Sequence, residues 1–116
     1  MGYFFDANIV IHGFLRAPDG TFTTIDAPGA GTGLFQGTVP ASINPAGAIT
    51  GVYFDASDVN HGFLRARDGS FTTFDVPGAG TGSGQGTFAG QQQPSGAITG
   101  VYIDANNVFH GFLYRP

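Results

Sequence analysis

The stretch His61–Gly80 reads HGFLRARDGSFTTFDVPGAG, and a near copy, HGFLRAPDGTFTTIDAPGAG, occupies His12–Gly31. Each copy has an apolar run, then Asp-Gly, then a second run rich in Phe and Thr. Asp-Gly between two runs of this kind is a strong signal for a β-hairpin. Both copies therefore predict two short antiparallel strands joined by a tight turn.

The hairpin belongs to a repeat of 49 residues. His12, His61 and His110 are each 49 positions apart, and residues 2–50 align with residues 51–99 without a gap. These two copies are identical at 31 of 49 positions, and residues 100–116 begin a third. Such a period indicates one supersecondary unit used repeatedly. We therefore treat residues 1–116 as a single repeat domain with two full repeats, 2–50 and 51–99, and a partial one, 100–116.

Each repeat predicts four strands, which gives roughly ten in the chain, grouped as four, four and two. Pro40 lies within the fourth predicted strand, and because proline has no N–H for a ladder it indicates an edge strand or an irregular segment there. The expected strands, in the order first, second, third and fourth, are Ala48–Asp55 (repeated at Ala97–Asp104), His61–Ala66, Ser70–Val76, and Gly37–Asn44 (repeated at Gly86–Gln93).

Apolar residues occur on both faces of these strands. Phe63 and Leu64 point to opposite sides of their strand, and Phe71 lies opposite Phe74. A sheet that is apolar on both faces must be covered on both. Stacked four-stranded blades of a β-propeller meet this need, and 49 residues is a typical blade length. We therefore predict an all-β fold of propeller blades.

One chain has too few strands to close such a ring, which needs at least four blades. An uncovered blade face of a few hundred Å² costs many kcal/mol at roughly 25 cal/mol per Å². We therefore predict a homo-oligomer, with a dimer favoured and a trimer possible.

The repeated string HGFLRARDGSFTTFDVPGAG, followed by the motif GAITGVYID, resembles the bacterial extracellular HAF-type repeat family. The resemblance covers nearly the whole chain and recurs with its period. It implies a secreted, propeller-like protein and an extracellular location, and it implies little about function.

The composition excludes several classes of protein. Lys and Glu are absent, the net charge is −4, and strong helix formers are scarce. Nucleic acids and membranes are therefore not expected partners. Without Cys there is no disulfide or thiolate metal site. No basic segment followed by an apolar one opens the chain, so we expect no signal peptide in it.

The candidate ligand-binding residues recur with the repeat and could serve a glycan. Arg offers a planar fork to paired oxygens, Tyr can stack on a sugar ring, and Asp can bind hydroxyls. The alternative for Arg16 and Arg65 is an inter-blade salt bridge to Asp26 or Asp75. The candidates are Arg16, Arg65, Tyr53, Tyr102, Asp26 and Asp75.

The repeated histidines are interpreted as structural, each bonded to a neighbouring backbone group or Asp. The Asp residues that end the first and third strands of a repeat are expected to cap turns, or else to face a ligand. No catalytic pair, nucleophile motif, metal set or cofactor site is predicted.

These observations favour a non-catalytic, lectin-like module that binds glycans at repeated sites, since linked weak sites give avidity. The alternative is a scaffold that self-assembles without a small ligand. The third hypothesis is a hydrolase with sites at subunit interfaces.

Overall fold

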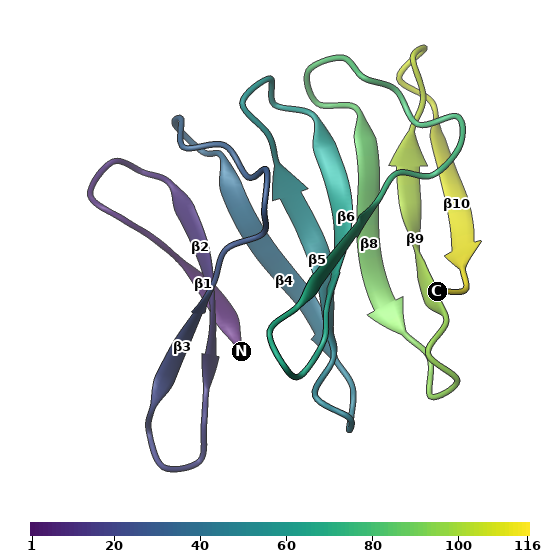
Figure 1. The fold of residues 1–116 in the computed structure, drawn as a ribbon. Helices are drawn as coiled ribbons and strands as arrows, with labels where there is room; N and C mark the ends of the chain where they lie inside the picture. Colours follow the sequence, from purple (N-terminus) through teal and green to yellow (C-terminus); the bar gives the residue numbers. More distant parts are fainter.

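The computed structural model describes all 116 residues and contains ten strands and no helix (Figure 1). It therefore has no helix that could cross a membrane. The predicted all-β class and the number of strands are confirmed. The strands are β1 (Gly2–Phe5), β2 (Ile11–Arg16), β3 (Phe22–Ile25), β4 (Gly37–Ile43), β5 (Ile49–Phe54), β6 (Asn60–Arg65), β7 (Phe71–Phe74), β8 (Gly86–Gln92), β9 (Ile98–Ile103) and β10 (Phe109–Tyr114).

The strands form one open, mixed sheet that falls into three antiparallel runs. β1, β2 and β3 make the first run, β4 to β7 the second, and β8 to β10 the third. Single parallel bridges, Ile11↔Gly37 and Asn60↔Gly86, join one run to the next. Strands β1 and β10 end the strand order, and β3 and β7 branch from it through β2 and β6.

At both parallel bridges, a glycine lies close to the backbone of the opposite strand. Gly37 and Gly86 have φ of 131° and 117°, in the region that favours glycine. A Cβ at Gly86 would overlap the backbone carbonyl oxygen of Asn60. The junction between runs therefore requires glycine for both its conformation and its space.

The predicted interruption at Pro40 is present, because the β4–β5 register shifts between Pro40 and Ser42. β4 lies between β2 and β5 in the strand order, but it pairs with β2 at Gly37 alone, so at Pro40 its β2 side is unpaired, as in the predicted edge strand. Because β2 reaches β4 only at Gly37, the missing N–H of Pro40 breaks no ladder hydrogen bond to β2.

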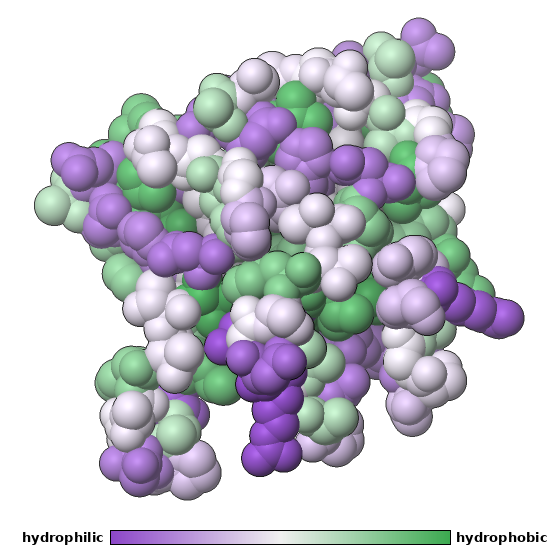
Figure 2. All heavy atoms as spheres, viewed as in Figure 1, coloured by the Kyte–Doolittle hydropathy of each residue, from purple (hydrophilic) through white to green (hydrophobic).

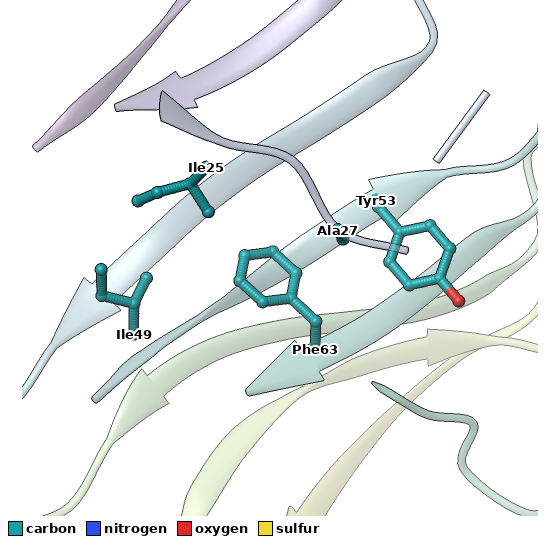
Figure 3. Packing of buried hydrophobic residues seen from close by; sticks show 5 residues of the cluster. All are labelled: Ile25, Ala27, Ile49, Tyr53 and Phe63. Carbon is teal, nitrogen blue, oxygen red and sulfur yellow. The ribbon is translucent and has the colours of Figure 1, made fainter. Parts of the chain in front are cut away.

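The main core lies where the first run meets the second. Ile25 and Ala27, at the end of β3, pack with Ile49, Tyr53 and Phe63 of β5 and β6 (Figure 3). Phe63, Ile25 and Ile49 are at most 1% exposed. The first run thus covers a face of the second, and Phe74 of the second run contacts Phe112 and Tyr114 of the third.

Burial on both faces is confirmed for β5 and β6 but is wrong for β7. Five of the six residues of β5 are buried, whereas Thr72 and Thr73 of β7 are exposed and Phe71 and Phe74 are only half-buried. Phe74 contacts Phe112 and Tyr114 of β10, so the fully exposed residues of β7 are the two threonines.

Large apolar side chains reach the surface on the strands at both ends of the sheet, and others do so on the face seen in Figure 2. At the first end, Tyr3, Phe5 and Phe22 are 51–63% exposed. At the other end, Phe109 is 68% and Leu113 55% exposed. Apolar surface of this kind at both ends is unusual for a chain that works alone.

Candidate functional site: a repeated aspartate–histidine–aspartate cluster

The repeated histidines occupy the same place in each unit. His61 lies near the start of β6, opposite Tyr53 of β5, and the two rings stack at 4.9 Å between centroids. His110 stacks on Tyr102 in the same way, at 4.8 Å. In the first unit, Phe4 takes the place of the tyrosine, 5.3 Å from His12. An aromatic cross-strand neighbour therefore fixes the plane of each imidazole.

Two carboxylates hold the edges of the His61 ring. Its Nε2 lies 2.7 Å from Oδ2 of Asp55, and its Nδ1 lies 2.6 Å from Oδ1 of Asp75. The corresponding distances from His12 are 2.8 Å to Asp6 and 2.6 Å to Asp26. A carboxylate only accepts hydrogen bonds, so both ring nitrogens must donate. The geometry therefore favours the imidazolium form.

The first carboxylate of each cluster also holds a turn. Oδ1 of Asp55 accepts hydrogen bonds from the backbone N–H groups of Ser57 and Val59, at 2.8 and 3.0 Å. Asp6 and Asp104 bind the corresponding N–H groups of their turns. The predicted capping by these three residues is therefore confirmed. Asp26 and Asp75 bind the histidine rings, and no hydrogen bond from a backbone N–H to their carboxylates is seen.

The surroundings shift the pKa of His61, Asp55 and His12 toward the charged form. Burial opposes charge on His61, but its hydrogen bonds to Asp55 and Asp75 outweigh this and raise the pKa of the imidazole. Burial likewise pushes the pKa of Asp55 up, but the hydrogen bond from His61 and two from backbone N–H groups lower it overall. For His12, the hydrogen bonds to Asp6 and Asp26 raise the pKa.

The third cluster contains one carboxylate. Nε2 of His110 lies 2.8 Å from Oδ2 of Asp104, and its Nδ1 has no partner. The side chain of His110 is 41% exposed, compared with 24% for His12 and 20% for His61. The second carboxylate of a cluster follows the third strand of the unit, and no such strand pairs with β10.

The complete clusters suit a mechanical role better than a catalytic one. With both nitrogens bound to carboxylates, His61 has no lone pair to take a proton or to bind a metal. No group of three or more His or Asp residues in the structure is arranged to hold a metal ion. The charged ring of His61 on β6 instead holds Asp55, which follows β5 and caps a turn, and Asp75, which follows β7.

The structure brings only some of the predicted ligand residues together. Tyr53 and Asp75 meet at His61, and Tyr53 is only 8% exposed, so no face of its ring is free for a sugar. Arg65 pairs with Ile49 at the opposite end of β5, about 13 Å along the strand from Tyr53. The predicted set Arg65, Tyr53 and Asp75 is therefore not one site.

The first repeat has the same arrangement. Asp26 lies at His12, whereas the guanidinium of Arg16 lies 6.0 Å from the ring centre of Phe22, near the β2–β3 turn. Tyr102 stacks on His110. Within the chain, neither Arg16 nor Arg65 forms the inter-blade salt bridge to Asp26 or Asp75, because the ion-pair partners of these carboxylates are His12 and His61. The signal in the sequence for these His–Asp pairs was that the histidine and the aspartate both recur every 49 residues.

A polar hollow of about 550 Å³ lies beside the ends of β4 and β8. Asn44 and Gln92 line it and are joined by a 3.1 Å hydrogen bond, and Arg115 and Leu64 also border it. None of the residues predicted to bind a ligand lines this hollow.

No family model, curated protein or solved structure matches this chain. The resemblance to HAF-type repeats therefore stays a prediction.

Proposed function

We propose that this chain is a non-catalytic structural module whose antiparallel four-strand unit is one blade of a β-propeller. The observation that carries the proposal is the run β4 to β7, a four-stranded antiparallel meander of the kind that forms propeller blades. Packing between successive runs supports it, since Ile25 and Ala27 of one run cover Phe63 of the next.

In this proposal the module works by assembling with further copies of itself. The exposed side chains at both ends, among them Phe5, Phe22, Phe109 and Leu113, support association that covers them. The chain alone lacks the four blades that a ring needs. Resemblance to the HAF-type repeats adds an extracellular location, which fractionation of the producing cells with an antibody to this chain would test.

The absence of catalysis is part of the same proposal. The two complete His clusters have both ring nitrogens engaged, which leaves no free general base. We expect no turnover above background on a panel of chromogenic esters and glycosides. Hydrolysis that disappears in His61→Gln would contradict this part.

Sedimentation velocity of matched variants tests the proposal. Phe109→Asp places a charge on the exposed end strand β10, and Ser83→Asp places the same charge on an exposed loop. We expect the first variant to dissociate at micromolar concentration, while the second sediments like the wild type. Equal behaviour of the two variants would count against association through the β10 end of the sheet.

A second candidate is carbohydrate binding at the polar hollow. Its volume falls in the range of small-molecule sites, and its amide and guanidinium groups suit hydroxyls. On a glycan array, this candidate expects Arg115→Met to lose binding and Arg65→Met to keep it, because Arg65 does not line the hollow. The reverse result would favour the binding set predicted from the sequence.

A further inference from the structure

A glutamine lies at each junction between runs and forms hydrogen bonds to both of them. At the first junction, the backbone carbonyl of Gln36 accepts from the N–H of Ile11, in β2 of the first run, at 2.7 Å. The side-chain Nε2 of Gln36 donates to Oδ1 of Asp58 at 2.9 Å and to the carbonyl oxygen of Ala56 at 3.2 Å. Both of these acceptors lie in the β5–β6 turn of the second run. Gln36 is 8% exposed, so one buried residue ties the two runs together.

The second junction has the same contacts. The backbone carbonyl of Gln85 accepts from the N–H of Asn60, in β6 of the second run, at 2.8 Å. Its Nε2 donates to Oδ1 of Asn107, in the β9–β10 turn of the third run, at 3.0 Å. Asn107 takes the place of Asp58, so the feature common to both junctions is a side-chain oxygen and not a charge.

The glycine-rich loops before β4 and β8 orient these glutamines. The N–H of Gly33 donates to Oε1 of Gln36 at 2.9 Å, and Gly82 bonds Gln85 in the same way. A Cβ at Gly31 would overlap Oε1 of Gln36, so the loop passes the amide as closely as glycine allows. The repeated sequence GAGTG therefore holds the amide oxygen and leaves the amide nitrogen facing the turn of the next run.

The acceptor lies at a turn position with a left-handed backbone. Asp58 and Asn107 have φ of 61° and 62°, a conformation in which Asp and Asn are enriched among residues other than glycine. Ile9 holds the equivalent position of the β1–β2 turn, with φ of 59°, and has no side-chain oxygen. Backbone conformation alone also favours Asp or Asn here, but glycine would satisfy that need better. Asp58→Gly therefore separates conformation from hydrogen bonding.

We propose that Gln36 and Gln85 set the position of each run on the next by recognising a side-chain oxygen at the left-handed residue of the following turn. They act as positioning residues, and Asp58 and Asn107 are the residues that they recognise. The β1–β2 turn, which has Ile9 at this position, cannot be recognised in this way. The hydrogen bonds lie within one chain, so the recognition goes beyond the proposed self-assembly and holds whether or not copies associate.

Substitutions at Asp58 test the recognition through urea midpoints at one fixed protein concentration. Asp58→Gly keeps the left-handed turn and removes the acceptor, so the folding equilibrium constant should fall about tenfold, as for a lost hydrogen bond to a carboxylate. Asp58→Asn keeps an oxygen, as Asn107 does, and should stay within about threefold of the wild type. Ile9→Gly is the matched control, and it should not lower the constant, because Ile9 has no side-chain oxygen to lose.

A double-mutant cycle tests whether Gln36 and Asp58 act together. Gln36→Met should leave Asp58→Gly with little further effect, since either substitution breaks the same bond. If Gln36→Met does not fold, the comparison of Asp58→Gly with Asp58→Asn still decides.

Hydrogen exchange gives a local readout in the folded protein. Asp58→Gly frees the amide of Gln36 to rotate, so the N–H of Gly33 should exchange faster, while that of Gly82 at the second junction should not change. Wild-type stability of Asp58→Gly, or equal exchange at Gly33 and Gly82, would overturn the recognition and leave backbone conformation as the reason for Asp58. Light scattering on the same samples measures self-association separately.

Discussion

Phe63→Ala is the substitution for which the structure gives the firmest magnitude. The side chain is 0% exposed and packs in the core with Ile25 and Ile49, and its ring centroid lies 5.8 Å from that of Phe71. A buried phenylalanine removes roughly 150–250 Å² from water, which at about 25 cal/mol per Å² is worth about 4–6 kcal/mol. Alanine retains part of this area, so we expect a loss of about 3–5 kcal/mol.

Urea denaturation at one fixed protein concentration measures this loss, since association adds a concentration-dependent contribution to stability. Phe14→Ala is the matched control, because Phe14 holds the same repeat position on β2 but is only half-buried. We expect it to cost about half as much or less. A loss below about 1 kcal/mol for Phe63→Ala, or equal losses at the two positions, would refute the packing of one run against the next.

Three further predictions concern pH, the parallel bridge and Arg65. The raised pKa of His12 and His61 stabilises the fold fully below pH 6.5, the ordinary pKa of histidine, and this contribution is lost as the pH rises through the folded-state pKa. The lowered pKa of the aspartates that end the first strands stabilises the fold above pH 3.8, the ordinary pKa of aspartate, and this contribution is lost as the pH falls through the folded-state pKa. The melting temperature should therefore be highest between about pH 4 and 6.5, and His61→Gln should flatten its alkaline decline; an unchanged slope would argue against the charged cluster. Gly86→Ala should destabilise by about 2 kcal/mol or more, since its φ and the Asn60 carbonyl exclude a Cβ, while Gly111→Ala, with open space, should cost less than about 1 kcal/mol; similar urea midpoints for the two would contradict this. Arg65→Met should shift the melting temperature by less than about 2 °C because Arg65 forms no ion pair, and a larger fall would indicate a contact that the structure lacks.

The strands could be predicted from the sequence because each is bounded by residues with a specific conformational role. Asp68-Gly69 sets the β6–β7 hairpin, and Gly69 has the positive φ expected there. Because the two copies align without a gap, a strand boundary identified in one copy also applies at the equivalent position of the other. The parallel bridges at Gly37 and Gly86 were not predictable in this way, because the sequence does not indicate which distant residue a single bridge will pair with.

The candidate site was harder to predict because it depends on register. Tyr53 and Arg65 are both repeated polar residues in adjacent strands, yet antiparallel pairing places Tyr53 at His61 and Arg65 at Ile49. The sequence predicted that His61 would bond a neighbouring backbone group or Asp. It did not indicate that Asp75, beyond the next turn, would reach the second ring nitrogen, since that depends on the β6–β7 pairing.

The mass of the wild-type protein in solution tests the central claim most directly, because a closed ring of at least four blades requires more than one copy of this chain. Light scattering at micromolar concentration should give an integer multiple of 12.0 kDa, with two or three copies in a single stable species. A well-folded 12.0 kDa monomer that stays soluble under the same conditions would contradict the account.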